Sequence, residues 1–214
     1  MLLPHHPGAL RTLRRPTPDA PWRVLVSGCL AGVRCGVDGT DNGLGDVLRT
    51  FLALPTVHAL PFCPEDHALG TPRTTPDLHG GDGVDVVAGR ARVLDEHGAD
   101  LTEALLRGAR AMLAFALSER AELALLTDMS AACGSQVISD GARSAAERRY
   151  RRGVGVATAL LLDAGVPVAS QRDARTLAAL RALADPSSAP PGDASDHHEH
   201  PWVRTHLPGP HPRA

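Results

Sequence analysis

The chain has 214 residues, of which 43% are hydrophobic and 3% aromatic, and its formal net charge at pH 7 is −2. This length suits one sizeable domain with tails, whose core must be built from Ala, Val and Leu. All 22 basic residues are Arg, which excludes chemistry that needs a Schiff-base or P-loop lysine. The small net charge gives no general reason to expect binding to DNA or to a membrane.

No stretch approaches the ~18 consecutive apolar residues of a membrane span. The N-terminus also lacks an apolar segment followed by a cleavage site, so no secretory signal is recognised. We therefore expect a cytoplasmic protein. In that compartment the four cysteines indicate catalysis or metal binding rather than disulfide bonds.

The first third of the chain alternates short apolar runs with glycine- and proline-rich segments. Residues 1–21 contain five prolines and no apolar periodicity, which predicts a disordered tail. The elements expected next are a strand at 24–26, a glycine-rich loop at 30–42, a helix at 44–54, a strand at 58–62 and a long loop at 66–83.

The rest of the chain continues this alternation until residue 184. The expected elements are a hairpin of strands 84–87 and 91–94, a helix capped by Asp100 or Thr102 that reaches about 120, a strand at 123–126, a helix at 153–164, a strand at 166–169 and a helix at 173–184. Residues 185–214 are rich in proline and histidine, which predicts a second disordered tail.

Strands that alternate with helices predict an α/β fold with a doubly wound, mostly parallel sheet of the Rossmann-like or flavodoxin-like kind. We expect a single domain over residues 22–184, between the tails 1–21 and 185–214.

Three cysteines follow predicted strands: Cys29, Cys63 and Cys133. The carboxyl ends of parallel strands share one edge of a sheet, and ligands bind in the crevice beyond that edge. We therefore expect the three thiols to form one site. The alternative is that each cysteine is simply a small buried apolar residue.

Three thiolates suit Zn²⁺ or an iron–sulfur cluster. A structural zinc site normally has a fourth Cys or His, often at CxxC spacing, and the chain contains no CxxC. A cubane cluster held by three cysteines would leave one iron free for substrate. Cys35 is either a fourth ligand or a spare thiol, and the spacing alone leaves both zinc and iron open.

Five segments carry a family resemblance: SGCLAGVRCGVDG, FCPEDHALGTPR, ARVLDEHGADLTEALLRGA, SAACGSQVISDG and GVGVATALLLDAGVPVAS. In this order they resemble the family catalogued as domain of unknown function 523, whose characterised members are thiouracil desulfidases. The resemblance extends from about Arg23 to Asp173. Its most specific parts are CPE followed by TPR, and the SxxCGS loop.

The resemblance implies a small α/β enzyme that binds a [4Fe-4S] cluster through Cys29, Cys63 and Cys133. The remaining iron would take the sulfur from a thiolated pyrimidine, and Ser130 would be a catalytic residue. The chain departs from the family pattern in two places. SAAC stands where SPSC is usual, and ARSAAERRYRR replaces a glycine-rich segment.

Other residues allow two interpretations each. Ser130 can move a proton if a neighbour orients it, or it can cap a turn. Glu65 can act as general acid or base, or can pair with Arg73 in the same region. We consider Arg73 and Asp38 candidate substrate-binding residues, although Asp38 precedes a glycine and is also typical of a tight turn.

Two further groups of residues are basic or metal-binding in character. Five arginines within 143–152 precede the helix expected at 153, where they either contact phosphate or RNA or form a solvated loop. His197, His198 and His200 can bind metal adventitiously, but the neighbouring prolines argue against an ordered site.

The leading hypothesis is a [4Fe-4S]-dependent, non-redox desulfidase that converts a thiolated pyrimidine, as a base, a nucleoside or RNA, to its oxo form. The competing hypothesis is a non-catalytic zinc or iron–sulfur module that serves a partner. Neither hypothesis specifies an oligomeric state.

Overall fold

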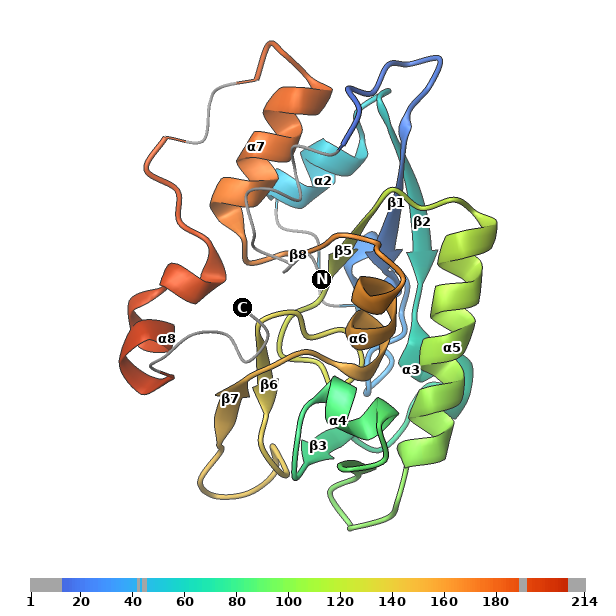
Figure 1. Ribbon diagram of the computed structural model, residues 1–214, viewed down its shortest axis with the longest axis vertical. Helices are drawn as coiled ribbons and strands as arrows, with labels where there is room; N and C mark the ends of the chain where they lie inside the picture. Colours follow the sequence, from blue (N-terminus) through green and yellow to red (C-terminus); the bar gives the residue numbers. More distant parts are fainter. Residues whose placement is uncertain (1–12, 42, 44–45, 189–191, 208–214) are drawn as a thin grey trace.

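The computed structural model describes residues 13–41, 43, 46–188 and 192–207. Its centre is a parallel sheet of four strands: β1 (Trp22–Ser27), β2 (Val57–Phe62), β5 (Leu123–Leu126) and β8 (Val168–Ser170). They lie in the order β2-β1-β5-β8, as Figure 1 shows. The strand order places β1 and β5 in the middle, and the predicted doubly wound, mostly parallel sheet is confirmed.

Helices cover both faces of this sheet (Figure 1). Along β1, Leu25 packs on one face while Val24 and Val26 pack on the other, because successive side chains of a strand point to opposite sides. The first face is covered by α5 (Thr102–Ser118) and α6 (Val156–Asp163), and the second by α2 (Asp46–Leu52) and α7 (Ala174–Ala184). Residues 44–45 of the helix expected at 44–54 lie outside the described residues.

The strand ends are level with one another. Ser27 at the end of β1 lies opposite Phe62 at the end of β2. Just beyond β5, the backbone N–H of Thr127 donates to Ser27 Oγ at 3.0 Å. The loops that follow β1, β2 and β5 therefore emerge side by side at one edge of the sheet.

A short helix, α3 (Pro64–Leu69), begins immediately after β2. Pro64 occupies its first turn, where the missing N–H costs no hydrogen bond, and Cys63 caps it by accepting from Asp66 N at 3.3 Å. Gly108 of α5 packs so closely on the backbone of Pro64 that any side chain there would clash. Six residues are too few for helical periodicity, so the sequence predicted mostly loop here.

The hairpin expected at 84–87 and 91–94 is wrong. Residues 84–87 belong to helix α4 (Gly83–Val87), because the Asp82 carboxylate accepts from Val84 N and forms a capping box with Asp85. The second half is a strand, β4 (Arg92–Leu94), but its antiparallel partner is β3 (Asp77–His79).

A second two-stranded unit was not predicted. It consists of β6 (Val137–Ser139) and β7 (Tyr150–Arg152), so part of the arginine-rich segment is strand rather than loop. The helix expected from residue 153 begins at Val156 instead. Its N-cap, Gly155, lies so close to the carbonyl of Ala132 that a Cβ would clash.

The described parts of both tails contact the domain, in contrast to the disorder that we expected. At the N-terminal side, the Trp22 indole N–H donates to the carbonyl of Arg14 at 2.8 Å. At the C-terminal side, a 3-10 turn, η2 (His197–Glu199), and a helix, α8 (Pro201–His206), bury Asp196 and Val203. Composition misled here because polar contacts hold these segments, not a periodic apolar face. Residues 1–12 and 208–214 lie outside the described residues.

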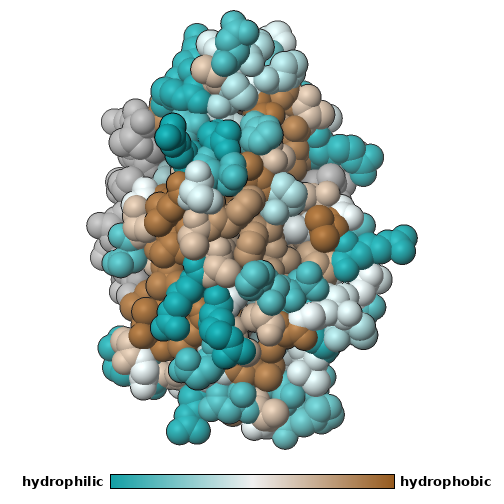
Figure 2. Space-filling model, turned by 90° about the vertical axis from the view of Figure 1, so that its right-hand side faces the viewer, coloured by the Kyte–Doolittle hydropathy of each residue, from teal (hydrophilic) through white to brown (hydrophobic). Residues whose placement is uncertain are grey.

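Within the described ranges, no helix has the length and apolar character needed to cross a membrane. Figure 2 shows the face on the α5 side of Figure 1, where apolar residues are interspersed with hydrophilic ones.

Candidate functional site

A cavity of about 730 Å³ lies at the carboxyl edge of the sheet, where the loops after β1, β2 and β5 meet. All four cysteines of the chain line it, together with Glu65, Arg73 and Ser130. Two further arginines, Arg143 and Arg172, also contribute to its wall. The cavity therefore contains most of the chemistry-bearing residues that the sequence indicated.

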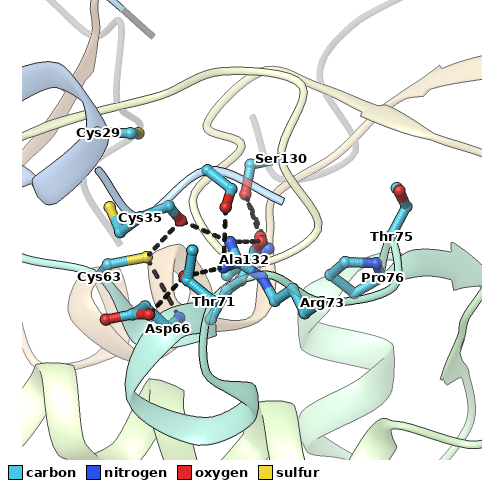
Figure 3. A network of polar contacts seen from close by, with 12 residues as sticks. Cys29, Cys35, Cys63, Asp66, Thr71, Arg73, Thr75, Pro76, Ser130 and Ala132 are labelled. Carbon is cyan, nitrogen blue, oxygen red and sulfur yellow. Dashed lines mark hydrogen bonds and ion pairs between the residues drawn. The ribbon is translucent and has the colours of Figure 1, made fainter. Parts of the chain in front are cut away.

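Each of the three predicted ligands reaches the cavity from a different element. Cys29 lies in the 3-10 turn η1 (Gly28–Ala31) directly after β1, and its Sγ lies 3.1 Å from Thr127 Oγ1. Cys63 caps α3, and Cys133 lies buried in the loop after β5. Figure 3 shows Cys29 and Cys63 on the same side of the network as Cys35.

Cys35 is buried next to Cys63. A Cβ on Gly28 would lie 3.2 Å from Cys35 Sγ, so the glycine makes room for this thiol. Burial raises the pKa of the Cys35 thiol far above its usual value, and the neighbouring Cys63 raises it further. Cys35 thus lies among the four cysteines that line the cavity.

The protein alone does not stabilise thiolates at this site. Burial raises the pKa of Cys63 and of Cys133, and the nearby carboxylate of Glu65 raises both further. Arg73 opposes this effect at Cys63, but its guanidinium is already paired with Glu65. Thiols become thiolates when they coordinate a metal. Four cysteines, none of them in a disulfide, line one cavity and therefore fit a soft metal centre.

Ser130 is both a turn cap and an oriented hydroxyl. Its Oγ accepts from the backbone N–H of Ala132 at 3.1 Å and of Cys133 at 3.0 Å. The same hydroxyl donates to Glu65 Oε1 at 2.9 Å. Both interpretations that the sequence allowed for Ser130 thus describe one arrangement (Figure 3).

Glu65 pairs with Arg73, as one of its two interpretations predicted, and its role as general acid or base stays a prediction. Its second oxygen, Oε2, lies 2.9 Å from Arg73 Nη2, and the two side chains are only 11% and 5% exposed. Arg73 also donates to the carbonyls of Cys35 at 2.9 Å and of Gly70 at 3.2 Å. Arg73 lines the cavity, but these bonds direct its guanidinium to protein groups.

Asp38 lies outside the cavity, although its neighbours Gly36 and Val37 line it. Its exposed carboxylate accepts from Thr40 N at 3.0 Å and from Thr40 Oγ1 at 2.6 Å, and these bonds lower its pKa. The structure therefore places Asp38 in a tight turn next to the cavity lining, and the substrate contact that we considered for it stays a prediction.

Sequence reasoning missed a second buried carboxylate at the cavity wall. Asp128 follows β5, and its Oδ2 lies 2.6 Å from His197 Nδ1. The two residues are 69 positions apart, so no local pattern could link them.

His198 lies beside Asp173 and Asp196, with one ligand atom of each within 4.8 Å of the others. Both carboxylates already accept backbone N–H groups, which is a structural role.

The family model for 2-thiouracil desulfurase matches residues 24–173. The chain belongs to this family. The chain is also similar to the protein described as uncharacterised protein YbbK, of Bacillus subtilis (strain 168). YbbK is 35% identical over 153 residues, which cover 70% of this chain and 96% of YbbK.

A solved structure adds to the comparison: that of the [4Fe-4S]-dependent thiouracil desulfidase TudS. It matches with a TM-score of 0.62 and 32% identity, over 76% of this chain and 99% of TudS. The family match contains the cysteines, Glu65, Arg73 and Ser130, whereas His197 lies beyond its end.

Proposed function

We propose that the protein is a desulfidase that uses a [4Fe-4S] cluster to replace the sulfur of a thiolated pyrimidine with oxygen. The observation that carries this proposal is the Ser130–Glu65 hydrogen bond of 2.9 Å, in the same cavity as three thiols from three strand ends. Membership of the 2-thiouracil desulfurase family supports it, as does the likeness to TudS. The four free cysteines suit the cytoplasm, where we propose that the protein acts.

Cys29, Cys63 and Cys133 would hold the cluster, and Cys35 would remain a buried neighbour. When bound, a cluster with three protein ligands offers one iron with an open position, a Lewis acid that suits a soft thiocarbonyl sulfur. The fit to this group rests on donor type and position, because three soft sulfur ligands from the loops after β1, β2 and β5 line one cavity.

The protein's own residues handle the proton. Water adds to the ring carbon that carries sulfur, and its proton passes to Ser130 Oγ while the hydroxyl proton of Ser130 passes to Glu65 Oε1. To accept the water, Oγ gives up one of its two hydrogen bonds from backbone N–H groups. Arg73 supplies the counter-charge that holds Glu65 in place. The carbon–sulfur bond then breaks as the added hydroxyl becomes a carbonyl, and the proton of that hydroxyl and the proton held by Glu65 leave with the sulfide. Sulfur departs in the oxidation state of sulfide, so the reaction needs no reductant.

The substrate is a thiolated pyrimidine, presented as a free base, as a nucleoside or within RNA. The test is to reconstitute the protein with iron and sulfide without oxygen. Thiouracil, a thiolated nucleoside and thiolated RNA are then supplied separately, with no reductant. We expect sulfide release and conversion to the oxo form with at least one of them. If cluster-loaded protein releases no sulfide from any of the three, the non-catalytic metal module is the better description.

The ligand set has its own test, in which iron content is measured after reconstitution. Cys63→Ser should fail to retain the cluster, because thiolates hold Fe–S clusters directly. Cys35→Ser is the matched control, since this thiol lies beside Cys63 and lines the same cavity. Iron loss in Cys35→Ser together with iron retention in Cys63→Ser would reverse our assignment.

A further inference from the structure

The C-terminal segment places a histidine against the loop that carries Ser130. His197 belongs to η2 and lies 24 positions beyond Asp173, where the family match ends. Its Nδ1 lies 2.6 Å from Asp128 Oδ2, and both residues are buried, at 8% and 4% exposure. This pair takes no part in the proton path through Ser130 and Glu65.

Asp128 organises the loop through its other oxygen. Oδ1 accepts the backbone N–H of Met129 at 3.1 Å, of Ser135 at 2.9 Å and of Gln136 at 3.1 Å. One carboxylate oxygen thus fixes both ends of the segment in which Ser130 and Cys133 lie. Met129 has a φ of +65°, a left-handed conformation that is costly for a side chain of this kind. A strained residue beside Ser130 persists only because neighbouring bonds hold it.

His197 is the partner that makes a charged Asp128 tolerable in the interior. Burial alone would raise the pKa of Asp128. The hydrogen bond and the charge of His197, with the loop N–H groups, outweigh burial and lower this pKa instead. A buried carboxylate that loses its partner is strongly destabilised. The arrangement of the loop therefore depends on a group outside the family domain.

Separate contacts hold the C-terminal segment in place. Asp196 accepts from Thr176 N at 2.9 Å and from Thr176 Oγ1 at 2.8 Å. Glu199 pairs with Arg175 at 2.8 Å. His197 is thus presented to Asp128 by a segment that is attached to α7 independently of the loop.

We propose that His197 is a positioning residue for the desulfidase reaction: it holds Asp128, and through Asp128 the loop that presents Ser130 and Cys133. This inference rests on the proposed function for its kinetic consequence, but its structural part does not. The C-terminal segment thereby acts as a clamp on one wall of the cavity.

The structural part is tested by hydrogen–deuterium exchange of residues 127–137 in the full-length protein. Exchange should be faster in His197→Ala than in wild type, because the N–H groups on Asp128 lose their anchor. His197→Asn keeps an N–H near the position of Nδ1 and should restore protection. His206→Ala is the matched control: it removes an exposed histidine of the same segment, whose Nδ1 lies 3.0 Å from the carbonyl oxygen of Trp202, and it should leave the exchange of this loop unchanged.

The kinetic part uses cluster-loaded enzyme and a thiolated pyrimidine that wild type turns over. In His197→Ala we expect kcat to fall by about 10- to 100-fold, since misplaced catalytic groups lose rate without losing binding. KM and iron content should stay near the wild-type values. Because His197 acts through Ser130, the double variant with Ser130→Ala should be little slower than Ser130→Ala alone.

Three results would overturn the proposal. These are unchanged exchange of residues 127–137 in His197→Ala, an equal effect of His206→Ala, or rate losses that multiply in the double variant. If His197→Ala does not fold, His197→Asn decides the matter, because it must match wild type in both exchange and kcat. If wild type releases no sulfide, the proposed function fails, while the exchange result still decides whether the clamp exists.

Discussion

The two walls of the cavity are built in different ways. The wall formed by the loops after β1 and β2 is held by a side chain, because the Arg73 guanidinium reaches Glu65 and the carbonyl of Cys35. The wall formed by the loop after β5 is held by its own backbone, whose N–H groups converge on Ser130 Oγ and Asp128 Oδ1. The Ser130–Glu65 hydrogen bond joins one wall to the other.

The two walls therefore contribute different properties to the site: the first contributes a charged pair, and the second a fixed geometry. The first wall contributes the carboxylate of Glu65, paired with Arg73, to which we assign the proton in the proposed reaction. The second contributes a hydroxyl whose position is fixed by amide groups that do not titrate. A substitution in the first wall should therefore leave a buried charge without its partner, whereas a substitution in the second should displace the Ser130 hydroxyl.

The largest effect is expected where the walls meet. Ser130→Ala removes the hydroxyl that donates to Glu65, so kcat should fall by about 10²- to 10⁴-fold with iron content unchanged. Steady-state sulfide release measures the rate. Ser135→Ala is the control in the same loop, since no hydrogen-bond partner of Ser135 Oγ is found among the described residues. A wild-type rate in Ser130→Ala would transfer the proton role to Glu65 alone.

The first wall should fail through its charge. Arg73→Gln leaves Glu65 buried without a cation, and the free energy of unfolding should fall by about 3–5 kcal/mol, as measured by urea denaturation. Arg90→Gln breaks an exposed pair with Asp85 and should cost less than about 1 kcal/mol. Equal losses of unfolding free energy in the two variants would mean that the buried Arg73–Glu65 pair contributes no more to stability than the exposed pair.

The second wall should be sensitive to the C-terminal segment. Deletion of residues 193–214 removes the bonds to Asp128 and Thr176 and the buried Val203 side chain. We expect the melting temperature to fall by several degrees, since about 1 kcal/mol corresponds to roughly 2–4 °C for a protein of this size. An unchanged melting temperature would show that this segment does not stabilise the domain, as we expected from its composition.

A pH-dependent effect is expected at Asp173, which contacts the loop after β5 through Gln136. Burial raises its pKa from 3.8 to about 7 in the folded protein. The folded state thus keeps a proton that the unfolded state loses, so this residue's contribution to stability falls as the pH rises from about 4 to 7. The difference in unfolding free energy between wild type and Asp173→Asn should therefore shift against wild type from pH 5 to pH 8. A difference that stays constant would contradict the raised pKa.

The first wall was largely predictable from sequence, because its residues lie in short motifs at strand ends. Cys29 and Cys63 follow apolar runs, and Glu65 and Arg73 lie within ten residues of Cys63. The Asp128–His197 pair was not predictable, since it joins residues 69 positions apart through a segment with no apolar period. Helix α4 was missed for another reason. Its five residues include three valines, and the capping box with Asp82 outweighs their strand preference.

The first turn of α6 has no capping side chain of its own. Its free N–H groups find carbonyls in the loop after β5 instead: Val156 N donates to Ala131 at 2.9 Å, and Ala157 N donates to Ala132 at 2.9 Å. The hydroxyl of Thr158 adds a bond to the carbonyl of Cys133 at 2.9 Å. The loop after β5 thus caps the N-terminus of α6 and also forms one wall of the cavity. The site would therefore be folded before the cofactor binds, unlike a zinc finger, which folds only when it binds its metal.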